Sequence, residues 1–384
     1  MTEPLRLLVL TELFLPTQGG TAVWFAEVYR RLGGKEIHIV TAAVPGSEKV
    51  DAVNPNTVHR LNLRRIAWIK PESLVMYWRF FAKSARLASR CRFMAIHAGR
   101  VLPEGLVAWL VARIMRIPVV IYAHGEEITT WRQPGKFKAM RFAYRHADRV
   151  VANSEFTREQ LLELGVSPKR LMIINPGVDT ERFKPGLPCD DLKNKIGLAP
   201  DQKLILSVGR LSRRKGFDTV IRSLPDILQQ KLDVRYALIG VGEDCEYLAN
   251  LARECGVLDR VHMLGHVAPE ELPRWYNAAD VFVMPNREIN GDTEGFGMVF
   301  LEAAACGKPV LAGISGGTAA AVEHEITGLR IDGTSQHQVT EGLARILGDR
   351  EFAMMLGRNG YVRVQRQFSW EATVMKTKEM IMGL

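Results

Sequence analysis

The chain has 384 residues, of which 47% are hydrophobic and 24% are charged, and it contains no low-complexity stretch. This composition is typical of a soluble globular protein and excludes disordered, collagen-like and coiled-coil chains, while the length predicts two domains. The net charge of +9 is uneven, because residues 1–190 carry +11 and residues 191–384 carry −2. Either the first half meets an anionic partner (nucleic acid, a membrane surface or a phosphorylated substrate), or the protein is merely basic.

The first half alternates short apolar runs with helical patterns, which predicts a parallel sheet covered by helices on both faces. The expected strands are residues 5–10, 37–41, 118–124, 149–154 and 170–177, and the expected helices are residues 21–32, 104–116, 136–146 and 157–165.

A stretch rich in proline and glycine, residues 181–191, predicts a linker, after which the same alternation restarts. The expected strands are residues 203–209, 234–240, 261–265, 281–285 and 309–313, and the expected helices are residues 218–230, 245–255, 271–279 and 298–307. A helical tail begins near residue 352 and breaks near residues 368–370. We expect two doubly wound α/β domains, one of residues 1–184 with the tail 367–384, the other of residues 185–366.

Cysteine spacing and hydropathy favour a cytoplasmic protein. The five cysteines include no C-x-x-C pair, which predicts buried free thiols and neither disulfides nor a zinc site. The apolar stretch 102–123 is interrupted by charges and does not predict a membrane span, and the N-terminal run lacks a signal-peptide cleavage pattern.

Residues 60–92 combine nine basic residues and one acid with five interleaved aromatic residues. The aromatic residues are Trp68, Tyr77, Trp78, Phe80 and Phe81. On a helix this pattern favours docking on an anionic membrane surface, since cations meet lipid phosphates and rings lie among the headgroups. An ordinary amphipathic helix with core aromatics gives the same pattern, but no nucleic-acid-binding motif accompanies it.

Two loops between a strand and a helix are candidates for phosphate binding. Gly19 and Gly20 precede one expected helix, where glycines let backbone N–H groups approach an anion. The loop Gly209–Gly216 (GRLSRRKG) precedes another and adds four cations, including Arg210 and Lys215. The dinucleotide fingerprint and the P-loop are both absent, which argues against NAD enzymes and P-loop NTPases.

A pair of carboxylates eight residues apart forms the densest motif, EGFGMVFLE, with Glu294 in a loop and Glu302 in the helix that follows. Eight helical steps cover about 12 Å, which suits two hydroxyl-bearing ends of one elongated ligand. Glu302 lies among apolar residues, where an unpaired charge is costly, so a polar ligand is the expected partner. His124 ends an expected strand and is predicted to face a ligand at the sheet edge; a structural histidine is the alternative.

These motifs together resemble the retaining glycosyltransferases of family 4. The segments PTQGG, AHGEE, NPGVD, VGRLSRRKG and EGFGMVFLEAAACGKPV occur in that order and cover nearly the whole chain. NREINGDTEGFG and AGISGG resemble the bacterial phosphatidylinositol-mannoside and related mannosyltransferases. After Ser315-Gly-Gly the chain has Thr318–Ala321 where the family often has Pro-Glu.

The resemblance implies the GT-B fold, with two Rossmann-like domains and a C-terminal helix that crosses back to the first. It implies transfer of a hexosyl group from a nucleotide-sugar with retention, through a front-face mechanism and without a cofactor or a metal. The donor-binding residues implied are Gly19, Gly20, Gly209, Arg210, Lys215, Val267, Glu294, Gly295, Phe296, Gly297 and Glu302. Of these, Arg210 and Lys215 would neutralise the diphosphate.

The same resemblance assigns catalytic roles to His124, Arg210, Lys215 and Glu294. Glu294 and His124 would hold the donor sugar, Glu302 the ribose, and the backbone near Val267 would face the base. GDP-mannose is the first candidate donor, ahead of UDP-glucose and UDP-N-acetylglucosamine. A lipid-linked or glycan acceptor and a position on the inner face of the membrane are expected. The alternatives are a nucleotide-sugar 2-epimerase and a noncatalytic protein that binds sugar nucleotides or nucleic acid.

Overall fold

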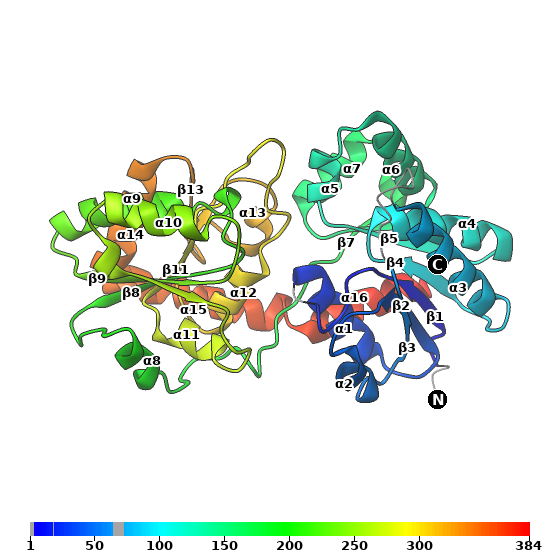
Figure 1. Cartoon of the computed structure of the whole chain (residues 1–384), viewed down its shortest axis with the longest axis horizontal. Helices are drawn as coiled ribbons and strands as arrows, with labels where there is room; N and C mark the ends of the chain where they lie inside the picture. Colours follow the sequence, from blue (N-terminus) through cyan, green and yellow to red (C-terminus); the bar gives the residue numbers. More distant parts are fainter. Residues whose placement is uncertain (1–3, 18, 64–72) are drawn as a thin grey trace. The chain divides into compact units, whose positions relative to one another are not determined.

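The computed structural model describes residues 4–17, 19–63 and 73–384, and the chain divides into two compact units (Figure 1). Unit 1 comprises Met1–Pro176 and Trp370–Leu384, and unit 2 comprises Gly177–Ser369. The expected boundary after residue 184 falls inside unit 2, because Phe183 is buried there against Tyr276, with 5.8 Å between the ring centroids.

Unit 1 is built on a seven-stranded parallel sheet with the order β3-β2-β1-β4-β5-β6-β7. Its strands are β1 (Leu7–Leu10), β2 (Ile37–Ala42), β3 (Thr57–Leu61), β4 (Ala95–Ala98), β5 (Val119–Ala123), β6 (Arg149–Ala152) and β7 (Leu171–Ile173). The sequence pattern did not reveal β3 and β4, which are short and, in β3, only half-buried.

Helices cover the sheet of unit 1 because its buried strands are apolar on both faces. They are α1 (Gly20–Leu32), α2 (Ser47–Ala52), α3 (Leu74–Ala88), η1 (Val101–Gly105), α4 (Leu106–Met115), α5 (Glu126–Thr130), α6 (Pro134–His146), α7 (Glu155–Glu163), η2 (Pro168–Arg170) and α16 (Trp370–Met382). Leu8 and Leu10 pack into the cluster formed with α3, α4 and α6. Helix α16 packs on α1, where Arg31 bonds to Glu371 at 3.1 Å.

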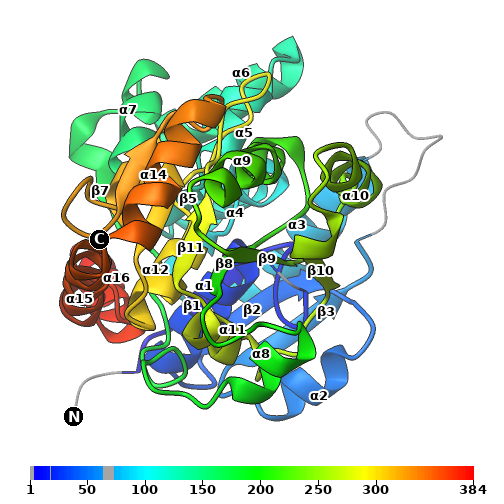
Figure 2. The ribbon, with the colours of Figure 1, turned by 90° about the vertical axis from the view of Figure 1, so that its left-hand side faces the viewer.

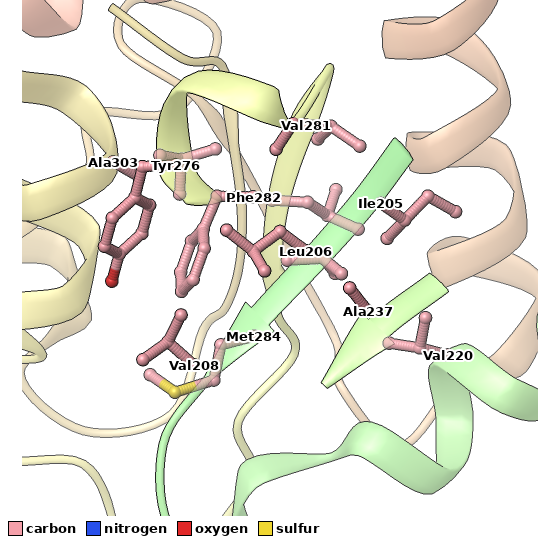
Figure 3. Close-up of a cluster of buried hydrophobic side chains, with 14 of the residues drawn as sticks. Ile205, Leu206, Val208, Val220, Ala237, Tyr276, Val281, Phe282, Met284 and Ala303 are labelled. Atoms are coloured by element: carbon pink, nitrogen blue, oxygen red, sulfur yellow. The ribbon is translucent and has the colours of Figure 1, made fainter. Parts of the chain in front are cut away.

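Unit 2 repeats this architecture with a six-stranded parallel sheet of order β10-β9-β8-β11-β12-β13. Its strands are β8 (Lys203–Val208), β9 (Val234–Ile239), β10 (Val261–Gly265), β11 (Val281–Met284), β12 (Val310–Gly313) and β13 (Leu329–Ile331). Figure 3 shows the core, in which Ile205 and Leu206 of β8 lie beside Val281 and Phe282 of β11.

The helices of unit 2 lie on both faces of its sheet. They are α8 (Asp190–Lys195), η3 (Arg213–Lys215), α9 (Phe217–Gln229), α10 (Cys245–Glu254), η4 (Leu258–Arg260), α11 (Leu272–Ala278), α12 (Met298–Ala305), α13 (Thr318–Ala321), α14 (Gln336–Gly348) and α15 (Arg350–Gln367). Helices α9 and α14 lie side by side (Figures 1 and 2). The tail thus forms two helices, α15 and α16, which belong to different units.

In both sheets the strand order reverses direction beside the first strand, and ligands of open α/β sheets bind at the carboxyl ends of the strands at such a point. In unit 2 the reversal lies between β8 and β11, which the loops Gly209–Gly216 and Pro285–Gly297 follow. In unit 1 it lies between β1 and β4, which the loop carrying Gly19 and the turn η1 follow. No helix in the described part of the chain is both long and apolar enough to cross a bilayer.

Candidate functional site

The basic loop of unit 2 packs backbone against backbone on the neighbouring loop. Gly216 ends this loop with φ of 75°, and a Cβ atom there would lie 2.1 Å from the carbonyl oxygen of Pro285. Any other residue would be strained in φ and would push the two loops apart. This close approach places Arg214 and Lys215 beside the loop that carries Glu294.

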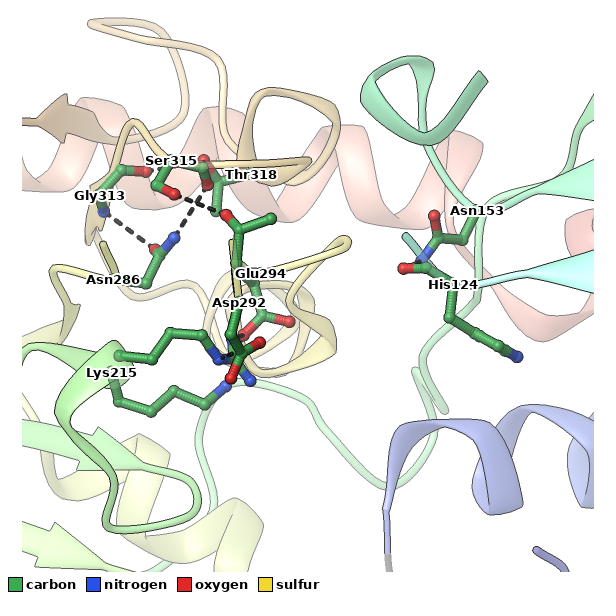
Figure 4. Close-up of polar contacts among 11 residues, drawn as sticks. His124, Asn153, Lys215, Asn286, Asp292, Glu294, Gly313, Ser315 and Thr318 are labelled. Atoms are coloured by element: carbon green, nitrogen blue, oxygen red, sulfur yellow. Dashed lines mark hydrogen bonds and ion pairs between the residues drawn. The ribbon is translucent and has the colours of Figure 1, made fainter. Parts of the chain in front are cut away.

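Glu294 is the centre of an ionic cluster (Figure 4). Its Oε2 atom accepts hydrogen bonds from Lys215 Nζ at 2.5 Å and from Arg214 Nη1 at 3.0 Å, and Arg214 Nε also lies 3.1 Å from Asp292. The side chains of Lys215 and Glu294 are mostly buried, with exposed fractions of 13% and 14%. Burial by itself raises the pKa of Glu294, but the charges of Lys215 and Arg214 outweigh it and lower that pKa to about 2.

Arg287 connects the two loops of this cluster and the start of α9. Its backbone N–H donates to the carbonyl oxygen of Arg214 at 2.9 Å. Its Nη2 atom bonds both carboxylate oxygens of Asp218 at 2.9 and 2.8 Å, and its Nη1 atom donates to Thr219 at 3.0 Å. Since Asp218 and Thr219 lie in the first turn of α9, one arginine ties the acidic loop both to the basic loop and to the helix that follows it.

Glu302, for which the sequence predicts a polar ligand as partner, also has a partner within the protein. The Tyr276 hydroxyl, from α11, donates to its Oε2 atom at 2.7 Å. Burial raises the pKa of Glu302, while the hydrogen bond from Tyr276 and the charge of Arg182 lower it. The other oxygen, Oε1, has no hydrogen-bond partner among the described residues, so Glu302 retains one acceptor for a ligand hydroxyl.

The remaining donor-site candidates of unit 2 lie on three loops at the same carboxyl edge. Arg210 is exposed and makes no ion pair within the described ranges, while Gly209 is half-buried beside it. Phe296 is buried, and Gly297 caps the N-terminus of α12. Gly295 lies between Glu294 and Phe296, and half-buried Val267 follows β10. These residues thus gather at one end of one sheet, and their role in donor binding stays a prediction.

His124 lies at the carboxyl end of β5 and belongs to unit 1, whereas the cluster just described belongs to unit 2. Its Nε2 atom bonds the carbonyl oxygen of Gly99 at 2.7 Å, which makes Nε2 the protonated nitrogen and leaves Nδ1 as an acceptor. Its backbone is held by Glu127 Oε1 at 2.9 Å and Asn153 Nδ2 at 3.0 Å. Burial lowers the pKa of His124, although Glu127 opposes this, so the imidazole is neutral near pH 7.

The glycine loop of unit 1 has room for a ligand. Gly19 has φ of 132°, and a Cβ atom there would meet nothing within 4 Å. Gly19 and Gly20 are both exposed, and Gly20 begins α1. The start of α1 thus has the exposed glycines that an anion site needs, and binding of an anion there stays a prediction.

Glu104 is a buried carboxyl group that the sequence did not reveal. It is fully buried in η1, and its Oε1 atom accepts the backbone N–H of Glu12 at 2.8 Å. Its Oε2 atom has no hydrogen-bond partner in the described part of the chain. Burial raises the pKa of Glu104 to about 7, although the hydrogen bonds and Arg100 oppose the shift. Glu104 anchors the segment between β1 and the glycine loop.

The predicted membrane patch is only partly a helix surface. Phe80 is completely buried in the core of unit 1, so the prediction that it lies at a lipid surface is wrong. Arg60 lies in β3 and pairs with Asp51 at 2.7 Å, and Trp78 is 65% exposed on α3. Residues 64–72, with Arg64, Arg65, Trp68, Lys70 and Glu72, lie outside the described residues.

Comparisons with known proteins assign the family. Residues 18–182 match the model of Glycosyltransferase Family 4, and residues 189–363 match that of Glycosyl transferases group 1. The chain is 31% identical over 384 residues, 98% of each chain, to a GDP-mannose-dependent alpha-(1-6)-phosphatidylinositol monomannoside mannosyltransferase of Mycobacterium tuberculosis. The chain belongs to glycosyltransferase family 4. A relative from Corynebacterium glutamicum, named for a monoacylated form of that acceptor, is 28% identical over 97% of this chain and 96% of its own.

Solved structures show that this glycosyltransferase has the GT-B fold. Anabaena Alr3699/HepE, in complex with UDP and glucose, superposes with a TM-score of 0.82 at 20% identity, covering 99% of this chain and 100% of its own. Sucrose-phosphate synthase from Thermosynechococcus elongatus superposes with a TM-score of 0.80 at 25% identity, covering 97% of each chain. The predicted fold and family are confirmed.

Sequence reasoning missed three side chains that organise the site of this glycosyltransferase. Arg214 was grouped with the loop cations but not assigned to Glu294, and Arg287 and Tyr276 were not singled out. The sequence did offer one signal for Arg287, which lies in the motif NREINGDTEGFG, seven residues before Glu294. Nothing in the sequence pairs Tyr276 with Glu302, because they meet only when α11 packs beside α12.

Proposed function

We propose that this glycosyltransferase moves a mannosyl group from GDP-mannose to a lipid-linked acceptor, with retention and without a metal ion. The observation that carries the proposal is the cluster in which two cations, Arg214 and Lys215, share one carboxylate, Glu294, at the carboxyl edge of the sheet. The names of the mycobacterial and corynebacterial relatives support the choice of donor and acceptor class.

Charge arithmetic explains what the cluster can do. The positive charges of Lys215 and Arg214 are compensated by Glu294 and Asp292, and that of Arg213 by Asp244, which leaves exposed Arg210 as a further cation of the same loop with no ion pair among the described residues. A diphosphate that enters beside this loop meets cations already fixed in place, which stabilises the charge that develops as the sugar bond breaks. Glu294, held as a carboxylate, can accept hydrogen bonds from sugar hydroxyls on the same side.

The proposed reaction needs no protein nucleophile. The bond between the anomeric carbon and the phosphate oxygen breaks, the acceptor oxygen bonds to the same face, and its proton passes to the departing diphosphate. His124 is suited to bind the donor sugar, because its neutral ring holds Nε2 on Gly99 and leaves Nδ1 as a hydrogen-bond acceptor. The described residues contain no group of three or more metal-ligating side chains, so the cations of unit 2 are the candidates for neutralising the diphosphate.

A membrane-bound acceptor is supported by the outer faces of α3 and α4. The stretch 73–125 contains one acidic residue, Glu104, and it is buried. Arg86 of α3 and Arg113 of α4 are exposed, as is Arg90, which follows α3. Each basic residue near an anionic surface contributes about 1 kcal/mol, so several together would hold the enzyme on the inner leaflet.

Donor choice is tested by thermal shift with GDP, UDP, GDP-mannose, UDP-glucose and UDP-N-acetylglucosamine. We expect stabilisation by GDP-mannose and GDP, and transfer of mannose with the α configuration retained, read by NMR of the product. Stabilisation by uridine nucleotides alone would refute the GDP-mannose assignment. Conversion of UDP-N-acetylglucosamine to its 2-epimer without an acceptor would favour the epimerase instead.

Glu294→Gln separates the roles within the cluster. The substitution frees Lys215 and Arg214 from their carboxylate, so affinity for GDP should be kept or increased while mannose transfer falls by about 10²-fold or more. Loss of GDP binding together with transfer would mean that Glu294 serves only to hold the loop.

A further inference from the structure

An open apolar groove lies between α3 and α4 of unit 1. It has a volume of about 480 Å³, and each described residue that lines it is aliphatic or aromatic. Helix α3 contributes Leu74, Trp78 and Phe81, and helix α4 contributes Leu106, Trp109 and Leu110. The volume lies within the range of about 300–1,000 Å³ that is typical of small-ligand sites.

The groove lies at the end of unit 1 that carries the candidate site. Its lining residues come from the first half of α3, which begins at Leu74, and of α4, which begins at Leu106. In a parallel sheet, a helix that follows a strand begins at the carboxyl edge of that sheet. His124 and Gly20 lie at the same edge, because they follow β5 and β1. A head group bound at this edge would therefore lie on the side of unit 1 where α3 and α4 begin.

The walls of the groove are unusually exposed for apolar side chains. Leu74 is 51% exposed, Trp78 65% and Leu110 43%, and Ile114 continues the strip along α4 at 58%. Isolated exposed apolar residues are common, but a contiguous strip rimmed by polar residues marks a binding surface. On the same two helices Arg86 and Arg113 are exposed, and Glu104, the one acidic residue among residues 73–125, is buried, so the exposed charge of this stretch is positive and complementary to an anionic lipid.

We propose that this groove binds one acyl chain of the glycosyl acceptor while the acceptor's head group lies at the carboxyl edge of unit 1. The inference rests on the proposed function and specifies its acceptor: a phospholipid-type glycolipid, recognised by its chain as well as its sugar. An acyl chain fits because it neither donates nor accepts hydrogen bonds and the lining of the groove is apolar. Each methylene buried there strengthens binding by about fourfold.

The test compares two acceptors in the full-length enzyme with GDP-mannose as donor: a diacylated phosphatidylinositol monomannoside in detergent and its deacylated, water-soluble counterpart. Wild type should favour the acylated acceptor in kcat/KM by about 10²-fold, as burial of a few methylenes requires. The variants Trp78→Ser and Leu110→Asn should lose most of this preference while keeping activity on the soluble acceptor. Trp78 is 65% exposed and Leu110 is 43% exposed, so folding should be preserved. Val53→Asn, at an 82% exposed position after α2, is the matched control.

A second measurement reports on occupancy directly. A phospholipid brominated along its acyl chain should quench the Trp78 fluorescence, seen as the difference between wild type and Trp78→Phe, and Leu110→Asn should weaken that quenching. Unchanged acyl preference in both groove variants, or no quenching of Trp78, overturns the inference.

The alternative occupants give different results. If the variants detach from anionic vesicles but keep the acyl preference in detergent, the groove contacts the bilayer and the proposal is wrong. If wild type is a dimer in solution and the variants are monomers, a second copy of the chain covers the groove and the proposal is also wrong. If wild type transfers mannose to neither acceptor, the proposed function fails, and the quenching experiment still decides whether the groove holds an acyl chain.

Discussion

The two carboxyl edges of this glycosyltransferase are built on the same topology but on opposite chemistry. In unit 2 the edge is dense in charge, with Lys215 and Arg214 on Glu294 and Arg287 on Asp218. In unit 1 the edge carries a histidine that donates to a carbonyl and a buried carboxyl with no partner on one oxygen among the described residues, and exposed Glu126 beside them has no ion pair there either. A site for a diphosphate needs fixed cations, whereas a site for a sugar and a lipid needs hydrogen bonds and apolar surface.

The largest expected effects lie in the basic loop of unit 2. Lys215→Ala and Arg210→Ala should each lower kcat/KM by about 10²–10³-fold, because each removes a charge that opposes the charge developing on the leaving diphosphate. Their effects on stability should differ. Lys215 is paired with Glu294, whereas Arg210 is exposed with no ion pair in the described part of the chain.

Urea denaturation separates the two variants. Arg210→Ala should leave the free energy of unfolding within about 0.5 kcal/mol of wild type, while Lys215→Ala should lower it by about 1 kcal/mol or more. Activity of either variant within about threefold of wild type would remove that residue from the site.

Arg287→Met tests whether the charged edge must be held in place. We expect kcat/KM to fall by about 10–100-fold, as for other residues that orient the groups in contact with substrate. Stability should also fall, because Asp218 is left without its partner. The double variant Asp218→Asn with Arg287→Met should recover part of the stability and none of the activity.

The matched control is Arg363→Met. Arg363 is buried to a similar degree, with an exposed fraction of 15% against 16% for Arg287, and it bonds Glu323 and the carbonyl oxygens of Ala320 and Ala321 outside the site. It should lose stability without loss of kcat/KM. Equal kinetic losses in both variants would mean that Arg287 acts only through general stability.

Glu104→Gln probes the neutral edge of unit 1. Burial raises the pKa of Glu104 from 4.5 to about 7, so between these values the unfolded chain releases a proton that the folded chain retains. This contribution makes wild type less stable as pH rises from about 4.5 to about 7, and it is constant above and below that range.

In Glu104→Gln this dependence is absent. The stability of the variant relative to wild type should therefore be higher at pH 8 than at pH 4 by about 3 kcal/mol. Urea unfolding at the two pH values measures it. An equal stability difference at both would show that Glu104 titrates normally in the folded protein.

Chelation is expected to have the smallest effect. If the cations of the basic loop neutralise the diphosphate by themselves, turnover in excess EDTA should stay within about twofold of the untreated rate. Complete loss that Mg²⁺ or Mn²⁺ restores would contradict the metal-independent proposal.

The sequence by itself determined the repeated strand–helix alternation, because buried parallel strands need continuous apolar runs. It also predicted which segments carry chemistry, since Lys215, Glu294 and His124 follow strands and Glu302 lies in the helix after Glu294. It did not reveal β3 or β4, whose short runs resemble loops until neighbouring strands pair with them.

Only the tertiary structure decided which of these residues meet. The partners Arg214 and Glu294 are 80 residues apart, and Glu12 and Glu104 are 92 apart. Tyr276, which compensates Glu302, and Arg287, which holds the basic loop, were found only in the folded chain. Local sequence sets propensity and hydropathy, but hydrogen bonds between distant loops depend on strand order, and strand order is a property of the assembled sheet.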